Sequence, residues 1–137
     1  MNPFRLPIRL LARQRHSIFI FHKVPQASSA LTPNEMVLAS FERRLDQIAE
    51  NFKVVPLEES ITNFRNRRWR DRLASITFDD GYPEWVTTVL PALQKRNLPA
   101  TFFITTGQFF GTPLWHERII HAITQATLPI LSLKTPK

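Results

Sequence analysis

The stretch Ile76-Thr77-Phe78-Asp79-Asp80-Gly81-Tyr82 decides how this chain of 137 residues is interpreted, because an apolar run leads directly into two adjacent carboxylates and a glycine. Residues 75–78 predict a short buried strand. Asp79 and Asp80 then lie at its C-terminal end, where parallel α/β sheets and barrels carry their functional groups. Gly81 permits the sharp turn that brings two neighbouring acids toward one cleft.

Two close carboxylates repel each other unless a cation lies between them or one of them keeps a proton. A divalent metal held by one carboxylate, with the other acting as a base, meets that requirement. The alternative is an ordinary surface turn, since Asp and Gly are common in turns for backbone reasons. The position between a buried strand and the segment 82–97 favours a functional loop.

The rest of the sequence alternates between strand and helix patterns, without repeats, which predicts a parallel α/β arrangement. The predicted strands cover residues 17–21, 53–56, 75–78 and 100–105. The predicted helices cover residues 33–50, 57–64 and 91–96. Thr32-Pro33-Asn34-Glu35 matches a capping box at the start of the first helix. Phe41, Leu45, Ile48 and Phe52 recur at helical spacing, so their stripe is expected in the core.

Thr77-Phe78-Asp79-Asp80-Gly81 resembles the first motif of the polysaccharide deacetylases that share the NodB homology domain, also called carbohydrate esterase family four. The resemblance extends over residues 16–120. It is also carried by Ile18-Phe19-Ile20-Phe21-His22-Lys23-Val24, by Phe52-Lys53-Val54-Val55-Pro56-Leu57 and by Pro99-Ala100-Thr101-Phe102-Phe103-Ile104. Several ordered segments are more specific than one short motif. The resemblance implies the N-terminal part of a distorted (β/α) barrel of the glycoside hydrolase and deacetylase type.

In that family the first aspartate of the motif is the general base and the second is a metal ligand. The resemblance therefore implies these roles for Asp79 and Asp80. It also implies a divalent metal, which we expect to be zinc, and the hydrolysis of N-acetyl groups on a polysaccharide or oligosaccharide. His22, Tyr82 and Thr105 are expected at the rim of the same site, because each lies at or shortly after the C-terminal end of a predicted strand.

The sequence departs from the family pattern in its last part. The remaining metal ligands are two histidines in a later motif, and neither this motif nor those with the catalytic arginine and histidine occur before Lys137. A complete barrel needs about 200 residues or more. We therefore expect residues 16–137 to form a deacetylase domain truncated at its C-terminus, without stable metal and inactive alone. The alternative is a degenerate domain that binds a glycan or a partner chain without catalysis. Exposed sheet edges favour self-association.

Four histidines were considered as substitute ligands. His116 and His121 lie five residues apart on a predicted helix, which rotates their side chains about 140° from each other. This geometry is poor for chelation, so both are expected on the helix surface. His22 has the alternative of a structural hydrogen bond. His16 precedes the first strand and is given no role.

The formal net charge of +7 is concentrated in two segments. Residues 1–15 hold four arginines and no acids and form a basic N-terminal segment, and Arg65-Asn66-Arg67-Arg68-Trp69-Arg70-Asp71-Arg72 holds five arginines and one acid. A basic run with a tryptophan is one way to bind nucleic acid or an anionic surface. No nucleic-acid motif accompanies it, so we favour a solvated connection.

No secretory signal is recognised, because Arg5, Arg9 and Arg13 interrupt each apolar stretch of the N-terminal segment. A cytoplasmic protein is therefore expected, with a weak amphipathic surface anchor as the alternative for residues 1–15. Residues 98–115 carry no charge, but prolines and glycines interrupt them, so they do not predict a membrane span. Cysteine is absent, which excludes disulfides as a source of stability.

Overall fold

The structure is a computed structural model, and it describes residues 15–68 and 72–126. The chain divides into two compact units, Met1–Thr105 and Thr106–Lys137. The predicted basic segment 1–15 lies outside the described residues except for Arg15. The same holds for residues 69–71 of the second basic run.

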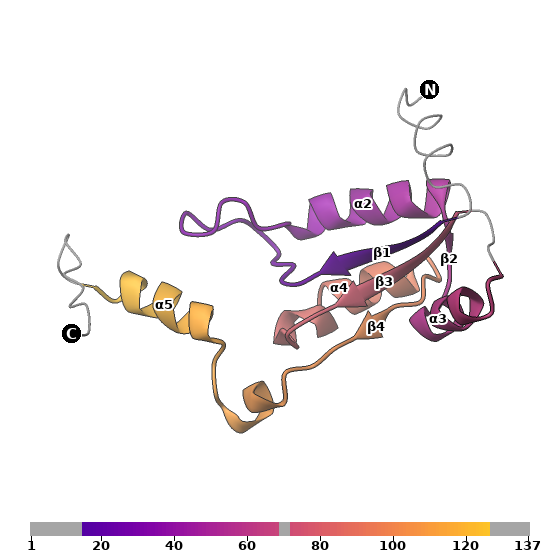
Figure 1. The fold of residues 1–137 in the computed structure, drawn as a ribbon. Coiled ribbons are helices and arrows are strands. Elements are labelled where there is room, and N and C mark those ends of the chain that lie inside the picture. Colours follow the sequence, from indigo (N-terminus) through magenta and orange to yellow (C-terminus); the bar gives the residue numbers. More distant parts are fainter. Residues whose placement is uncertain (1–14, 69–71, 127–137) are drawn as a thin grey trace. The chain divides into compact units, whose positions relative to one another are not determined.

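A four-stranded parallel sheet forms the centre of the first unit (Figure 1). Its strands are β1 (His16–Phe21), β2 (Lys53–Val54), β3 (Leu73–Phe78) and β4 (Thr101–Phe102). β1 pairs with β3 along its whole length. β2 pairs with the first two residues of β3 and β4 with the last two, so these short strands share the other edge of β3. The predicted parallel α/β arrangement is therefore confirmed.

β3 is buried at all six positions, which is typical of a central parallel strand that is covered on both faces. β1 differs, because Ile18 and Ile20 are 51% and 58% exposed. The register places Ile18 opposite Ser75 and Ile20 opposite Thr77, so these four side chains share one face of the sheet. Among the described residues β1 pairs only with β3. Apolar side chains therefore lie next to an open sheet edge.

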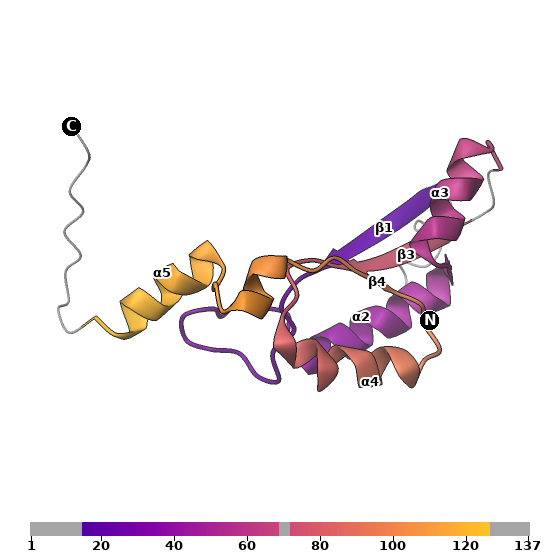
Figure 2. The same cartoon turned by 90° about the horizontal axis from the view of Figure 1, so that it is seen from below.

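The opposite face of the sheet carries a core that is rich in aromatic rings. Two helices cover this face (Figure 2), namely α2 (Leu38–Asn51) and α4 (Val89–Gln94). The ring centroid of Phe78 lies 5.4 Å from that of Phe21 and 5.8 Å from that of Phe41 in α2. Phe78 also stacks on Phe102 of β4 at 4.9 Å. Aromatic rings contribute much of the buried apolar area in a core, so this cluster fixes the end of β3 immediately before Asp79.

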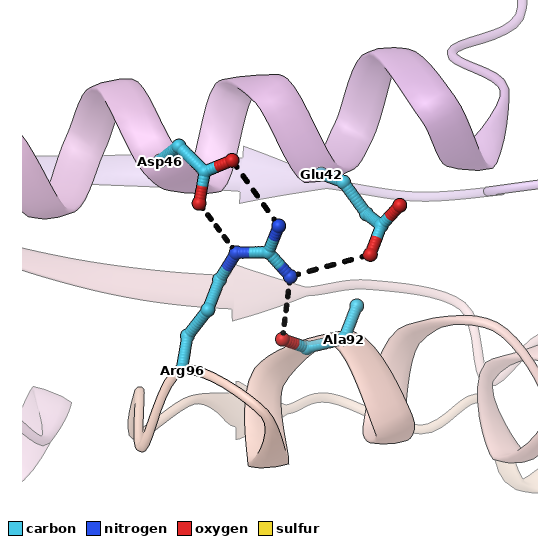
Figure 3. A network of polar contacts seen from close by, with 4 residues as sticks. All are labelled: Glu42, Asp46, Ala92 and Arg96. Atoms are coloured by element: carbon cyan, nitrogen blue, oxygen red, sulfur yellow. Dashed lines mark hydrogen bonds and ion pairs between the residues drawn. The ribbon is translucent and has the colours of Figure 1, made fainter.

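An ion-pair network joins α4 to α2 on the same side of the sheet (Figure 3). Arg96 Nε lies 2.6 Å from Asp46 Oδ1, and its Nη2 lies 3.2 Å from Asp46 Oδ2. Its Nη1 donates to Glu42 Oε1 at 3.3 Å and to the Ala92 carbonyl at 3.1 Å. The hydrogen bond from Arg96 holds the pKa of Asp46 below its ordinary value, and the same bond raises the pKa of Arg96. The two-pronged contact fixes the end of α4 against α2.

The predicted helix 33–50 begins only at Leu38. The Thr32 hydroxyl donates to a Glu35 carboxylate oxygen at 2.7 Å, so the two side chains of the predicted capping box bond to each other and form a turn. The first helical N–H, that of Leu38, donates to the Pro25 carbonyl at 2.9 Å. The loop after β1 therefore provides the acceptor that we expected from a side-chain cap.

Helix α3 (Leu57–Arg65) confirms a predicted helix and ends in a Schellman motif. Arg67 has the left-handed φ of 52°, which glycine normally occupies at this position. Its N–H donates to the Phe64 carbonyl at 3.1 Å, and the Arg68 N–H donates to the Asn63 carbonyl at 2.9 Å. The arginines from residue 65 to residue 68 are exposed, in agreement with a solvated basic run.

Other bounds differ from the prediction for physical reasons. The strands predicted at 53–56 and 100–105 have two residues each, because β2 and β4 share one edge of a six-residue strand. The last predicted helix begins at Val89 and not at Pro91, which is its third residue. Proline is tolerated there because an N–H in the first turn has no helical acceptor. His16, predicted to precede the first strand, is its first residue.

The second unit holds the short helix η2 (Thr106–Phe110) and helix α5 (Trp115–Thr124). The helix predicted around His116 and His121 is confirmed by α5. Trp115, Ile119 and Ile123 recur at helical spacing along α5 and are 72%, 50% and 50% exposed. In the part of the chain that the structure describes, every helix is too short or too polar to cross a membrane.

Candidate functional site

The two-carboxylate motif begins where the pairing of β1 and β3 ends. The backbone N–H of Asp79 donates to the Phe21 carbonyl at 3.0 Å. This bond continues the β1–β3 ladder by one residue and places Asp79 beside His22, the residue that follows Phe21. The predicted proximity of these two strand ends is therefore present in the structure.

The segment after β4 holds the other side of the motif. The Phe103 N–H donates to the Phe78 carbonyl at 2.7 Å, and the Thr105 N–H donates to the Asp80 carbonyl at 3.2 Å. Thr105, predicted at the rim of the site, is exposed and reaches Asp80 through this backbone bond. Main-chain hydrogen bonds from both sides thus fix the positions of Asp79 and Asp80.

The turn itself has an unusual backbone conformation. Asp80 has a φ of 88° and Gly81 a φ of 89°. A residue with a side chain in such a region costs about 1–3 kcal/mol, and such strain concentrates at functional sites. A Cβ atom on Gly81 would lie 2.9 Å from Cγ2 of Ile104, which leaves space for glycine alone. The prediction that Gly81 permits a sharp turn is confirmed.

The side chains of Asp79 and Asp80 are both half-buried, which leaves them reachable from solvent at the carboxyl edge of the sheet. His22 is exposed at the same edge. Tyr82, also expected at the rim, is 7% exposed and packs against Trp85 with 6.1 Å between ring centroids. Tyr82 therefore supports the turn from the core side.

Residues that sequence reasoning missed also surround the motif. Trp85, in the short helix η1 (Pro83–Val86), donates from Nε1 to the His22 carbonyl at 2.8 Å and so links the segment after the motif to β1. Lys23 Nζ lies 5.5 Å from the centroid of the Tyr82 ring, within the range of a cation–π contact. The only signal for these two residues in the sequence is their position, since Lys23 follows His22 directly and Trp85 lies four residues after Gly81.

Carboxylate and imidazole groups are the donors that a zinc site needs. Within residues 15–68 and 72–126, no group of three or more His, Cys, Asp or Glu side chains is placed to hold a metal ion. Asp79, Asp80 and His22 therefore do not fit a complete zinc site by themselves. His116 and His121 belong to α5 in the second unit, where His116 is half-buried and His121 is exposed.

Comparison with known protein families gives a match to the model of the polysaccharide deacetylases over residues 66–128. The matched region contains β3, the two-carboxylate turn and α5. The resemblance seen in the sequence is therefore confirmed over this region. No curated protein matches this chain in sequence.

Solved structures of deacetylases share the fold. IcaB from Ammonifex degensii is 25% identical over 65% of this chain and 37% of its own, with a TM-score of 0.57. A de-N-acetylase from Aggregatibacter actinomycetemcomitans is 19% identical over 64% of this chain and 36% of its own, with a TM-score of 0.55. The Streptococcus pyogenes deacetylase PplD, in complex with acetate, is 23% identical over 66% of this chain and 42% of its own, with a TM-score of 0.59. The chain thus spans 36–42% of their length, which confirms the expected partial barrel.

Proposed function

We propose that this chain contributes the two-carboxylate edge of a polysaccharide deacetylase domain, and that the complete domain removes N-acetyl groups from a glycan. The Asp79-Asp80-Gly81 turn carries the proposal. It lies within the region matched by the family model, at the carboxyl end of the central strand. An ordinary surface turn requires neither a left-handed aspartate nor a glycine in tight contact with Ile104.

The chemistry of the proposed reaction assigns a role to each carboxylate. Hydrolysis of an N-acetyl group adds water across an amide carbon–nitrogen bond and gives acetate and a free amine on the sugar. The attacking water must lose a proton, and the leaving nitrogen must gain one. Asp79 is our candidate for the base, because it matches the first aspartate of the motif that resembles the polysaccharide deacetylases, and its half-buried side chain lies at the carboxyl edge of the sheet. His22 and Thr105 are the neighbouring rim residues.

We further propose that the complete domain holds a divalent metal, which we expect to be zinc, with Asp80 as one of its ligands. The described residues alone do not fit such a site, since they contain no group of three suitable donors. The remaining ligands must then come from outside them. We therefore expect this chain alone neither to hold zinc tightly nor to release acetate.

The proposal can be tested with a chimeric protein that adds the rest of a deacetylase barrel to this chain. Residues 1–137 are joined to the part of the Streptococcus pyogenes deacetylase that lies beyond its match to this chain, and folding is checked by circular dichroism and cooperative unfolding. Acetate release is then measured on N-acetylglucosamine oligosaccharides. We expect Asp79→Asn to lower the rate by about 100-fold or more, because a positioned base contributes about that factor. The corresponding change Glu58→Gln, at an exposed carboxylate in α3, serves as the matched control.

Measuring the zinc content of the chimera distinguishes the proposed roles of Asp79 and Asp80. Asp80→Asn should lose zinc, whereas Asp79→Asn should keep zinc and lose turnover. A folded chimera that binds zinc but is no more active than its Asp79→Asn variant would contradict the enzymatic proposal. That outcome would favour a domain that binds glycan or a partner chain without catalysis.

A further inference from the structure

A second polar cluster lies at the opposite end of the sheet, where β1 and β3 begin. Nε2 of His16 lies 2.6 Å from Oγ of Ser60 in α3 and 3.3 Å from Oγ of Ser75 in β3. Ser75 donates its own hydrogen to the Val55 carbonyl at 2.9 Å. Ser60 and Ser75 are 4% and 0% exposed, so the cluster is buried between α3 and the sheet.

The His16 ring nitrogen bridges the two hydroxyl groups. Ser75 donates its hydrogen to Val55, so its oxygen is available only as an acceptor. With a hydrogen on Nε2 the His16 ring donates to both oxygens, and with its hydrogen on Nδ1 the ring accepts the Ser60 hydroxyl hydrogen at 2.6 Å. Burial lowers the pKa of His16, which favours the neutral ring.

A small cavity lies beside this cluster, lined by Arg15, His16, Ser60, Asn63 and Arg68 together with two apolar residues. Nδ2 of Asn63 is buried and has no hydrogen-bond partner among the described residues. A buried N–H without an acceptor costs about 1–3 kcal/mol. No carboxylate is among the described residues that line the cavity, and two of these residues, Arg15 and Arg68, carry guanidinium groups.

The size of the cavity limits what enters it. Its volume is about 10 Å³, which is about the space of one water-sized sphere. One oxygen atom of a larger group fits inside, and two of the lining residues, Arg15 and Arg68, are exposed to solvent. A water molecule would also satisfy Asn63, but it would not use the two guanidinium groups. Guanidinium groups bind oxyanions through paired, charge-assisted hydrogen bonds.

We propose that this cavity binds a phosphate-type oxyanion, with one oxygen accepting from Asn63 and the others accepting from Arg15 and Arg68. The exposed arginines at the end of α3 add positive charge around the mouth, which raises the local concentration of anions. The source of the group is either free inorganic phosphate or the phosphate monoester of a small metabolite. This site is separate from the two-carboxylate turn, and the proposal does not depend on deacetylase activity.

The test titrates inorganic phosphate into the full chain at constant ionic strength, with sodium chloride as the balancing salt. Unfolding midpoints and the NMR signal of the Asn63 side-chain amide report binding. We expect a saturable shift with phosphate and none when chloride replaces it. Arg15→Gln and Arg68→Gln should each weaken binding by about tenfold or more, because each removes charge-assisted hydrogen bonds.

Arg67→Gln is the matched control, because Arg67 carries the same charge in the same segment but does not line the cavity. It should weaken phosphate binding much less than Arg68→Gln does, because an exposed charge that makes no direct hydrogen bond to the anion contributes little. Equal weakening in Arg67→Gln and Arg68→Gln, or an equal response to chloride, would overturn the proposal. Asn63→Asp places a carboxylate in the cavity and should abolish binding, and retained affinity in this variant would also overturn it.

Two further ligands identify the source of the phosphate group. Glucose 6-phosphate that competes with inorganic phosphate supports a site for monoesters, and binding of inorganic phosphate alone supports a site for the free ion. A short oligonucleotide tests the remaining possibility. The oligonucleotide would overturn the proposal if it bound far more tightly than inorganic phosphate, with a steep salt dependence and an equal loss of affinity in Arg15→Gln and Arg68→Gln. The basic run would then be a general surface for polyanions, without a specific phosphate site.

Discussion

Gly81 and Ile104 are packed so closely that a Cβ atom on Gly81 would lie 2.9 Å from Cγ2 of Ile104. Gly81 also has a φ of 89°, a conformation that residues with side chains rarely adopt. Gly81 is therefore restricted both by its backbone conformation and by its contact with Ile104. The turn that carries Asp79 and Asp80 depends on both, because Gly81 follows them directly.

We expect Gly81→Ala to lower the free energy of unfolding by about 2–4 kcal/mol, from backbone strain and steric overlap together. Urea denaturation measures this loss. Ile104→Ala supplies the control, because it removes the atom that the new Cβ would meet. In that background the cost of Gly81→Ala should fall to the strain alone, about 1–2 kcal/mol. An unchanged cost would mean that the contact with Ile104 does not restrict this position.

Arg67→Gly should stabilise the chain by about 0.5–1 kcal/mol. Arg67 occupies the left-handed position of the Schellman motif with a φ of 52°, and glycine adopts this conformation without strain. Arg67→Ala removes the same charge but keeps the strain, so it should bring no gain. Thermal and urea unfolding of the two variants separate these effects, and equal stabilisation by both would point to charge instead of conformation.

The stability of the chain should depend on pH through His16. Burial lowers the pKa of His16 below the ordinary 6.5, so in this range the unfolded chain binds more protons than the folded chain. Stability is then complete above pH 6.5 and decreases as the pH falls toward the folded-state pKa. His16→Gln removes this contribution. The difference in urea midpoint between the wild type and this variant should shrink between about pH 7 and pH 5, and a constant difference would contradict the assignment.

Arg96 should contribute stability that disappears in acid. Its hydrogen bonds lower the pKa of Asp46 from the ordinary 3.8, so the contribution is present above that value and is lost as the pH falls through the lower folded-state pKa. Arg96→Gln should therefore lower the urea midpoint at neutral pH and have little effect in strong acid. Arg96→Lys should not restore stability, because an ammonium group cannot reproduce the two-pronged contact. Lys95→Gln is the control, because it removes a positive charge near Asp46 but leaves the hydrogen bonds from Arg96 in place.

Self-association through the outer edge of β1 should depend on Ile20, which is 58% exposed. We expect Ile20→Lys to reduce association, because a charged side chain on an edge strand opposes pairing with another chain. Size-exclusion chromatography with light scattering, over a range of concentrations, measures the effect. Val86→Lys makes the same change at an exposed position outside the strands. If both variants reduce association equally, added charge is responsible and the edge of β1 is not.

Local patterns in the sequence predicted the elements that depend on their own residues. The stripe of Phe41, Leu45 and Ile48 is buried as expected, and β3 ends directly before Asp79. The lengths of β2 and β4 could not be predicted in this way, because they depend on the shared edge of β3.

The position of the two-carboxylate turn at the end of β3 was predictable from the sequence, but the packing around it was not. The sequence placed Asp79, Asp80 and His22 at one edge of the sheet, and the backbone bond from Asp79 to Phe21 agrees with this placement. The burial of Tyr82 depends on packing against Trp85, which no local pattern reveals. The cluster around His16 was missed because its partner Ser75 lies 59 positions away in the sequence.

Three backbone hydrogen bonds at the two-carboxylate turn are donated by the main-chain N–H groups of Asp79, Phe103 and Thr105. Exchanging the side chain of Asp79 or Asp80 leaves these three donors and their carbonyl acceptors in place. Evolution or protein engineering can therefore vary the chemistry at this turn, for example by introducing histidine or asparagine, while these backbone bonds are kept. A rigid scaffold with interchangeable functional groups suits the installation of new metal ligands, provided that the glycine is kept.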